Sequence, residues 1–169
     1  MKYLSSLLLI LLLFIGCNKS PNEATVEGDF GIYLTADNIL PSDVKNMDLS
    51  KIKLQPEPII GINDIQVYER ESHAIYLTDS GVKKLDTFKI PVRGVSFIVC
   101  IGNKPIYSGA FWTGISSISF DGVIIELTFL YGNSVLISLG YPTEDFYKGK
   151  DPRSDPRIFE ALRRAGKLI

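Results

Sequence analysis

The chain of 169 residues has one histidine, His73, which could act as the general base of a hydrolytic site with a serine or cysteine nucleophile. Residues 42–45 and 80–83 both fit a Ser-x-x-Lys pattern, but the Ser-Asp-Asn and Lys-Thr-Gly motifs that accompany this pattern in acyl-transfer enzymes are missing. Cys100 lies in an apolar stretch, which is typical of a buried small hydrophobic residue and not of a nucleophile. We therefore expect no catalytic residue.

Metal-ligating side chains are also dispersed. No cluster of histidine and cysteine has the spacing of a metal site, and His73 is interpreted as a turn or strand-edge residue. Asp151 and Asp155 flank the stretch DPRSDPR, where aspartate before proline is typical of turns and helix caps. No glycine-rich loop has the spacing of a phosphate site. The sequence thus predicts neither a metal nor a cofactor.

Cys17 occupies a more informative position, at the end of the apolar run of residues 7–15 and directly after Gly16. A basic start at Lys2, a short apolar run and a small residue at its end are typical of a secretory signal peptide. The run is too short for a spanning helix, which needs about 20 apolar residues. The sequence therefore predicts a signal peptide over residues 1–16.

Residues 14–17, Phe-Ile-Gly-Cys, resemble the lipobox of bacterial lipoproteins, with phenylalanine where leucine is commoner. The resemblance implies cleavage between Gly16 and Cys17 and attachment of lipid, including fatty acids such as palmitate, to Cys17. Because two or more acyl chains make a stable anchor, we expect a protein held to the membrane of the cell envelope and exposed outside the cytoplasm. The alternative is an ordinary signal peptide followed by a chance cysteine. Residues 18–29 are polar and are expected to complete, with Cys17, a flexible tether over residues 17–29.

The charge of the chain is close to neutral. Removal of residues 1–16 takes away Lys2 and no acid, which moves the formal net charge from −1 to −2. With no basic stripe, nucleic acid is not expected as a partner. Once Cys17 is lipidated, Cys100 is left without a cysteine partner, so no internal disulfide is expected.

Residues 30–169 are predicted to form one α+β domain. Apolar, β-branched runs at 95–101, 104–111, 115–120, 123–130 and 135–141 are separated by Gly102-Asn103, Asp121-Gly122 and Gly132-Asn133, which are tight-turn pairs. This pattern predicts an antiparallel β-meander whose sheet is covered on both sides in the middle. Further strands are expected at 30–35, 65–68 and 74–78, and residues 38–57 are expected to form a long loop.

Two helices are expected to pack on this sheet. The first spans about residues 80–88, after a cap at Thr78 or Asp79. The second spans about residues 156–165, where Asp155-Pro156 is typical of a helix start and Gly166 of a helix end. Its apolar stripe consists of Ile158, Phe159, Leu162 and Ala165.

The segment YSGAFWTGISSISF contains the only tryptophan, Trp112. Aromatic residues beside glycine can fill a core next to a bend, or they can form an exposed anchor for a partner. In the second case Tyr107, Phe111 and Trp112 would bind the partner. The sequence leaves both alternatives open.

Residues 58–111 resemble the head of the first periplasmic domain of SecD-type protein-export subunits. The matching positions are Leu77, Thr78, Gly81, Lys84, Leu85, Gly102 and Ile106. The resemblance implies a compact α+β head that binds or positions another molecule, with no catalytic residue to carry over. The chain departs from that family because no membrane helix is expected after the signal peptide.

Two hypotheses about function follow. The first is a membrane-anchored envelope lipoprotein whose α+β domain is a non-catalytic module that binds a protein or peptide, either at an exposed strand edge or through the segment Tyr107–Trp112. The alternative is a small envelope hydrolase that uses a serine or cysteine with His73.

Overall fold

The computed structural model describes residues 27–128 and 132–169. The predicted signal peptide, Cys17 and most of the predicted tether therefore lie outside the described residues. The described part is a mixed α+β structure with an eight-stranded, mostly antiparallel sheet, as the sequence predicted at that level. Its strands are β1 Phe30–Leu34, β2 Ile60–Gly61, β3 Ile65–Glu69, β4 Ala74–Leu77, β5 Val95–Ile101, β6 Lys104–Trp112, β7 Phe120–Glu126 and β8 Ser134–Tyr141.

Three α-helices and three 3₁₀ turns complete the described chain: α1 Pro41–Val44, α2 Asp79–Asp86, α3 Pro156–Arg164, η1 Leu49–Lys51, η2 Ile62–Asp64 and η3 Glu144–Phe146. Both expected helices are confirmed. Thr78 caps α2 by accepting a hydrogen bond from the Gly81 N–H, and Asp155 caps α3 by accepting one from the Arg157 N–H.

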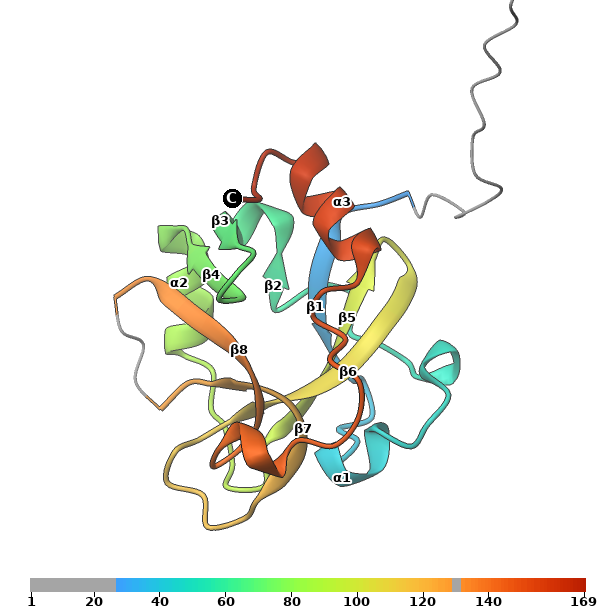
Figure 1. The fold of residues 1–169 in the computed structure, drawn as a ribbon, viewed down its shortest axis with the longest axis vertical. Helices are drawn as coiled ribbons and strands as arrows, with labels where there is room; N and C mark the ends of the chain where they lie inside the picture. Colours follow the sequence, from blue (N-terminus) through green and yellow to red (C-terminus); the bar gives the residue numbers. More distant parts are fainter. Residues whose placement is uncertain (1–26, 129–131) are drawn as a thin grey trace, which may run out of the picture.

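The sheet rolls back on itself (Figure 1). Its strand order is β2-β1-β5-β6-β7-β8-β4-β3, yet η2 alone joins β2 to β3, the strands at the two ends of that order. Alternate side chains of the strands meet inside the roll, as the two-residue period of a strand requires. Fully buried aromatic residues such as Phe30, Phe97 and Phe111 fill this interior. Helix α3 adds Ile158, Phe159 and Leu162 to the same core.

The outer face of the sheet is covered in its middle, as predicted from strands that are apolar on both faces. Ile98 and Cys100 point outward from β5 and are buried under Val44 and Ile52. Val44 and Ile52 belong to residues 38–57, which were expected to form a long loop. This segment in fact contains α1 and η1. The segment is ordered because its few apolar residues have an apolar strand face to cover.

The predicted meander is wrong between β6 and β7. The hairpin at Gly102-Asn103 is confirmed, with antiparallel pairing of β5 and β6, but β6 and β7 run parallel. Residues 113–119, expected to include a strand, form the connection, and Asp121-Gly122 lies inside β7. Stacking of Trp112 on Phe120 and two hydrogen bonds from the Tyr141 hydroxyl to carbonyls of this connection hold it in place. Part of the expected strand at 123–130 lies outside the described residues.

One edge of the sheet is closed by the end of the chain. The Tyr68 N–H donates to the Lys167 carbonyl, and the Ile169 N–H donates back to the Tyr68 carbonyl. Residues 167–169 therefore lie along β3 and occupy its outer edge. The opposite end of the order is β2, which is only two residues long.

Candidate functional site

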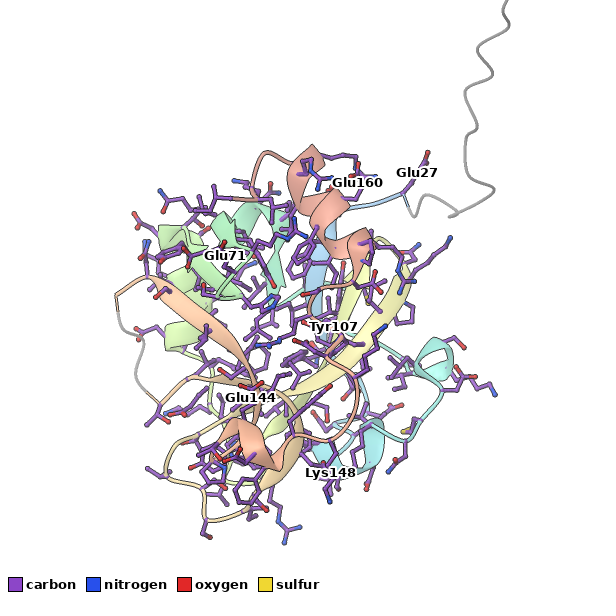
Figure 2. The ribbon with its side chains drawn as sticks, viewed as in Figure 1. Glu27, Glu71, Tyr107, Glu144, Lys148 and Glu160 are labelled. Atoms are coloured by element: carbon purple, nitrogen blue, oxygen red, sulfur yellow. The ribbon has the colours of Figure 1, made fainter. Side chains whose placement is uncertain are left out.

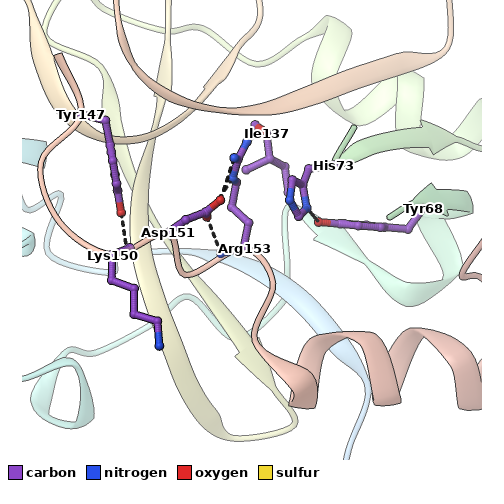
Figure 3. A network of polar contacts seen from close by, with 7 residues as sticks. All are labelled: Tyr68, His73, Ile137, Tyr147, Lys150, Asp151 and Arg153. Atoms are coloured by element: carbon purple, nitrogen blue, oxygen red, sulfur yellow. Dashed lines mark hydrogen bonds and ion pairs between the residues drawn. The ribbon is translucent and has the colours of Figure 1, made fainter. Parts of the chain in front are cut away.

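His73 is buried, and its imidazole faces the Tyr68 hydroxyl (Figure 3). Its Nδ1 is 2.9 Å from the Tyr68 hydroxyl, and its ring lies parallel to that of Phe159. Burial, and then the nearby Arg153 guanidinium, lower the pKa of His73, while burial raises the pKa of Tyr68. This arrangement fixes the imidazole between β3, β4 and α3.

The other groups required for a hydrolase lie elsewhere. Cys100 is fully buried on the outer face of β5, in a cluster separate from that of His73's neighbours, and burial raises the pKa of its thiol to about 11. A protonated thiol is a poor nucleophile. In the first Ser-x-x-Lys stretch, Ser42 donates to Asp43 and the Lys45 ammonium contacts Asp121, so these two side chains are not paired with each other. In the second, the Ser80 hydroxyl is 2.9 Å from the Thr78 hydroxyl.

The three aromatic residues considered as a partner anchor are interior. Tyr107 is 5 % exposed, Phe111 0 % and Trp112 2 %, and Tyr107 lies among the crowded side chains at the centre of Figure 2. Of the two alternatives for this segment, the structure favours aromatic residues that fill the core, because none of the three rings is on the surface. We therefore do not use them as binding residues.

The pair Asp151 and Asp155 does not converge on a shared site. The Arg153 guanidinium donates to both oxygens of Asp151, and Arg157 does the same to Asp155. The hydrogen bonds from these arginines hold the pKa values of both carboxyl groups below their usual range. Among the described residues, no group of three or more histidine, cysteine or acidic side chains is placed to hold a metal ion.

Asp64, which was not among the predicted site residues, contacts Thr78, Gly81 and Lys84. Its carboxylate accepts hydrogen bonds from the Gly61 N–H and the Lys84 ammonium, at 2.8 Å and 2.7 Å. Its backbone carbonyl accepts one from the Thr78 N–H. A Cβ on Gly81 would lie 2.7 Å from the same carbonyl oxygen, so a glycine is needed for this close approach. Thr78, Gly81 and Lys84 thus attach α2 to the turn between β2 and β3.

Strand β8 has an open edge. It pairs with β7 as far as Tyr141, but it pairs with β4 only through residues 134–136. One residue further, the Ile137 N–H still donates to the His73 carbonyl, at 3.2 Å. Because strand residues alternate in the side to which their N–H and C=O point, Leu139 directs its backbone groups toward the same side. No strand of the described sheet lies there.

A hollow of about 350 Å³ lies beside this open edge and extends over the outer face of β7 and β8. The residues that line it include Ser72, Ile137, Ser138, Leu139, Glu144 and Arg153. Arg153 is one of these lining residues, and its Nη1 donates to the Ile137 carbonyl at 2.8 Å, as Figure 3 shows. The hollow therefore combines free strand backbone with an arginine that already binds one carbonyl of the same strand.

A second hollow, of about 390 Å³, lies where the chain enters β1. Asp29, Glu57, Asp64 and Lys84 contribute its charged groups, but Asp64 and Lys84 are paired with each other. No edge of a long strand opens into it, so the hollow beside β8 is the stronger candidate for recognition of a polypeptide.

Sequence reasoning found neither hollow. The Gly61-Ile62-Asn63-Asp64 stretch does contain a local signal, because an acid three residues after a turn is typical of a capping interaction. The open edge has no local signal, since it depends on how far β4 extends beside β8.

The chain was compared with known proteins at three levels, and no family model, curated protein or solved structure matches it. Within residues 27–128 and 132–169, no helix is both long enough and apolar enough to cross a membrane.

Proposed function

We propose that this protein is a lipid-anchored lipoprotein of the bacterial cell envelope whose folded domain binds an extended protein segment, without catalysis, by strand addition along β8. The observation that carries the proposal is the unequal pairing of β8, which has a partner on one side as far as Tyr141 and on the other only through residues 134–136. An extended peptide can bind such an edge through backbone hydrogen bonds, with side-chain pockets adding selectivity.

The anchor is inferred from the lipobox-like residues ending at Cys17, and the resemblance to the SecD head supports a positioning module rather than an enzyme. The environments of His73 and Cys100 also favour the non-catalytic alternative. The imidazole is held by Tyr68 on one side of the sheet, and the thiol is buried in a different cluster. A hydrolase would require a nucleophile and a base within hydrogen-bonding reach.

Native-state amide exchange on the purified domain tests the open edge directly. The Leu139 amide should exchange at least about tenfold faster than the Ile137 amide, although both side chains are buried in the same strand. Equal protection of the two amides would mean that the edge is already occupied.

Photo-crosslinking in membranes tests binding at the edge. A photoreactive residue at Ser72, which is exposed and lines the hollow, should give a crosslinked partner, whereas one at exposed Ser117 should not. A second substitution, Ser138→Trp, should fill the hollow and remove the Ser72 crosslink while the melting temperature stays near that of the parent. A crosslink that survives Ser138→Trp would contradict strand addition at β8.

A further inference from the structure

We infer that the segment bound at β8 alternates basic and aliphatic residues, with the basic side chains between Glu126 and Glu144; this inference rests on the proposed strand addition. Both glutamates line the hollow of about 350 Å³, one from β7 and one from η3. Glu126 lies at the end of the strand that pairs with β8, and Glu144 lies in the turn that follows β8.

The charge of the hollow is negative. Arg153 is the only cation among its lining residues, and it is engaged by Asp151 through two hydrogen bonds. Neither Glu126 nor Glu144 forms an ion pair with another residue of the described chain. Arg153 is also close enough to Glu144 for that carboxylate to help raise the pKa of the guanidinium. One cation, already bound by Asp151, thus faces two carboxylates, which leaves the lining with a net negative charge for a positively charged ligand.

The alternation follows from the strand itself. In β8, Ile137 and Leu139 point into the core, whereas Leu136 and Ser138 point outward. A strand added beside β8 would present alternate side chains to the same two faces. Its inward residues would meet the apolar edge of the core, and its outward residues would lie on the face of Leu136, which is 49 % exposed. Lysine and arginine suit that outward face, because their aliphatic stems can cover leucine while their charged ends reach the glutamates.

Three eight-residue peptides with blocked ends test this inference: alternating valine–lysine, valine–serine and valine–glutamate. The measurements are the dissociation constant, from titration of the isotope-labelled domain, and the exchange rate of the Leu139 amide. We expect the lysine peptide to protect Leu139 and to bind about tenfold or more tightly than the glutamate peptide, with the serine peptide between them. The difference should shrink as salt is raised, because the two carboxylates are at the surface.

The double variant Glu126→Gln, Glu144→Gln should bring the lysine and glutamate peptides to nearly equal affinity. Glu57→Gln, which removes a carboxylate from the second hollow, is the matched control and should leave the ratio unchanged. Protection of Leu139 by all three peptides with equal affinity would overturn the charge preference and leave strand addition standing. If none of the peptides protects Leu139, or if Glu57→Gln removes the lysine preference, strand addition at β8 fails as well.

Discussion

At the scale of single residues, the ionisable groups of the interior form hydrogen bonds that hold the folded chain together. The imidazole of His73 is held by Tyr68, and the guanidinium of Arg153 is held by Asp151 and by the Ile137 carbonyl. His73 also has a backbone φ of 57°, which is uncommon for a residue other than glycine. This backbone turns the chain from β3 into β4 and directs the imidazole inward.

The lowered pKa of His73 makes stability depend on pH. Because the folded pKa lies below the ordinary value of 6.5, the unfolded chain binds a proton first as the pH falls. Stability should therefore decline from about pH 7 downward, with Arg153 opposing the new charge and Asp151 favouring it. Stability should fall further only below about pH 4, because the pKa values of three carboxyl groups are lowered in the folded protein, those of Asp121, Asp151 and Asp155.

The variant for comparison is His73→Asn, since asparagine tolerates positive φ and does not titrate. Urea unfolding of both proteins between pH 5 and 7.5 gives the free energy of unfolding at each pH. The wild-type slope over this range should exceed that of the variant, whatever their absolute stabilities. Parallel slopes would show that His73 does not titrate differently in the folded chain.

Gly81 gives a second prediction at this scale: replacing it by alanine should destabilise the protein, although helix propensity alone predicts stabilisation. Glycine to alanine inside a helix ordinarily stabilises by roughly 0.5–1 kcal/mol. In α2 the added Cβ would lie 2.7 Å from the Asp64 carbonyl oxygen, so Gly81→Ala should instead lower the free energy of unfolding by about 1–3 kcal/mol. Chemical denaturation measures the change, with Lys83→Ala on the exposed face of α2 as a control expected within about 0.5 kcal/mol of wild type. A more stable Gly81→Ala protein would mean that α2 can move away from Asp64.

At the scale of elements, the sequence predicted the features that depend on neighbouring residues, namely strand bounds, helix bounds and a hairpin turn. The bounds of β5, α2 and α3 follow from apolar periodicity and capping residues, and the β5–β6 hairpin follows from a Gly-Asn turn. Asp121-Gly122 has the same type of composition but lies within a strand, because Phe120 packs on Trp112 and thereby positions β7 parallel to β6. The open edge of β8 was likewise not predictable, since strand pairing across the sheet leaves no local pattern in the sequence.

Helix α3 should be essential for the core. The Phe159 ring is 5 % exposed, packs edge-on against Tyr68 and lies under the Arg70 guanidinium. Phe159→Ala should cost about 3–5 kcal/mol, a large part of the roughly 5–15 kcal/mol that stabilises a domain. Thermal melting should show a clear decrease in the midpoint, whereas Glu160→Ala on the exposed face should change it little. An unchanged midpoint for Phe159→Ala would mean that α3 is not part of the cooperative fold.

At the scale of the whole molecule, the proposed protein consists of a membrane anchor attached to a rolled sheet. Described residues begin at Glu27 on the outside of the domain, close to the β5–β6 turn, where Gly28 packs against Gly102 (Figure 1). The anchor would therefore attach at this end of the molecule, and β8 would remain accessible on its own side.

The anchor itself depends on Cys17. Cys17→Ser should leave an unprocessed precursor without lipid, because the thiol is the predicted site of attachment. Metabolic labelling with a fatty acid, followed by fractionation of membranes, measures both properties, and Cys100→Ser is the matched control that should keep the label. Label on the Cys17→Ser protein would exclude this residue as the lipid attachment site.

The pairing of residues 167–169 with β3 has a consequence for the order in which the fold is completed. During synthesis these residues leave the ribosome after every strand of the sheet. Until they do, β3 has no neighbour on its outer side, and an unpaired strand can join another copy of itself. The hydrogen bonds of Tyr68 with Lys167 and Ile169 therefore form only after all eight described strands have been synthesised, and β3 is open to self-association until then.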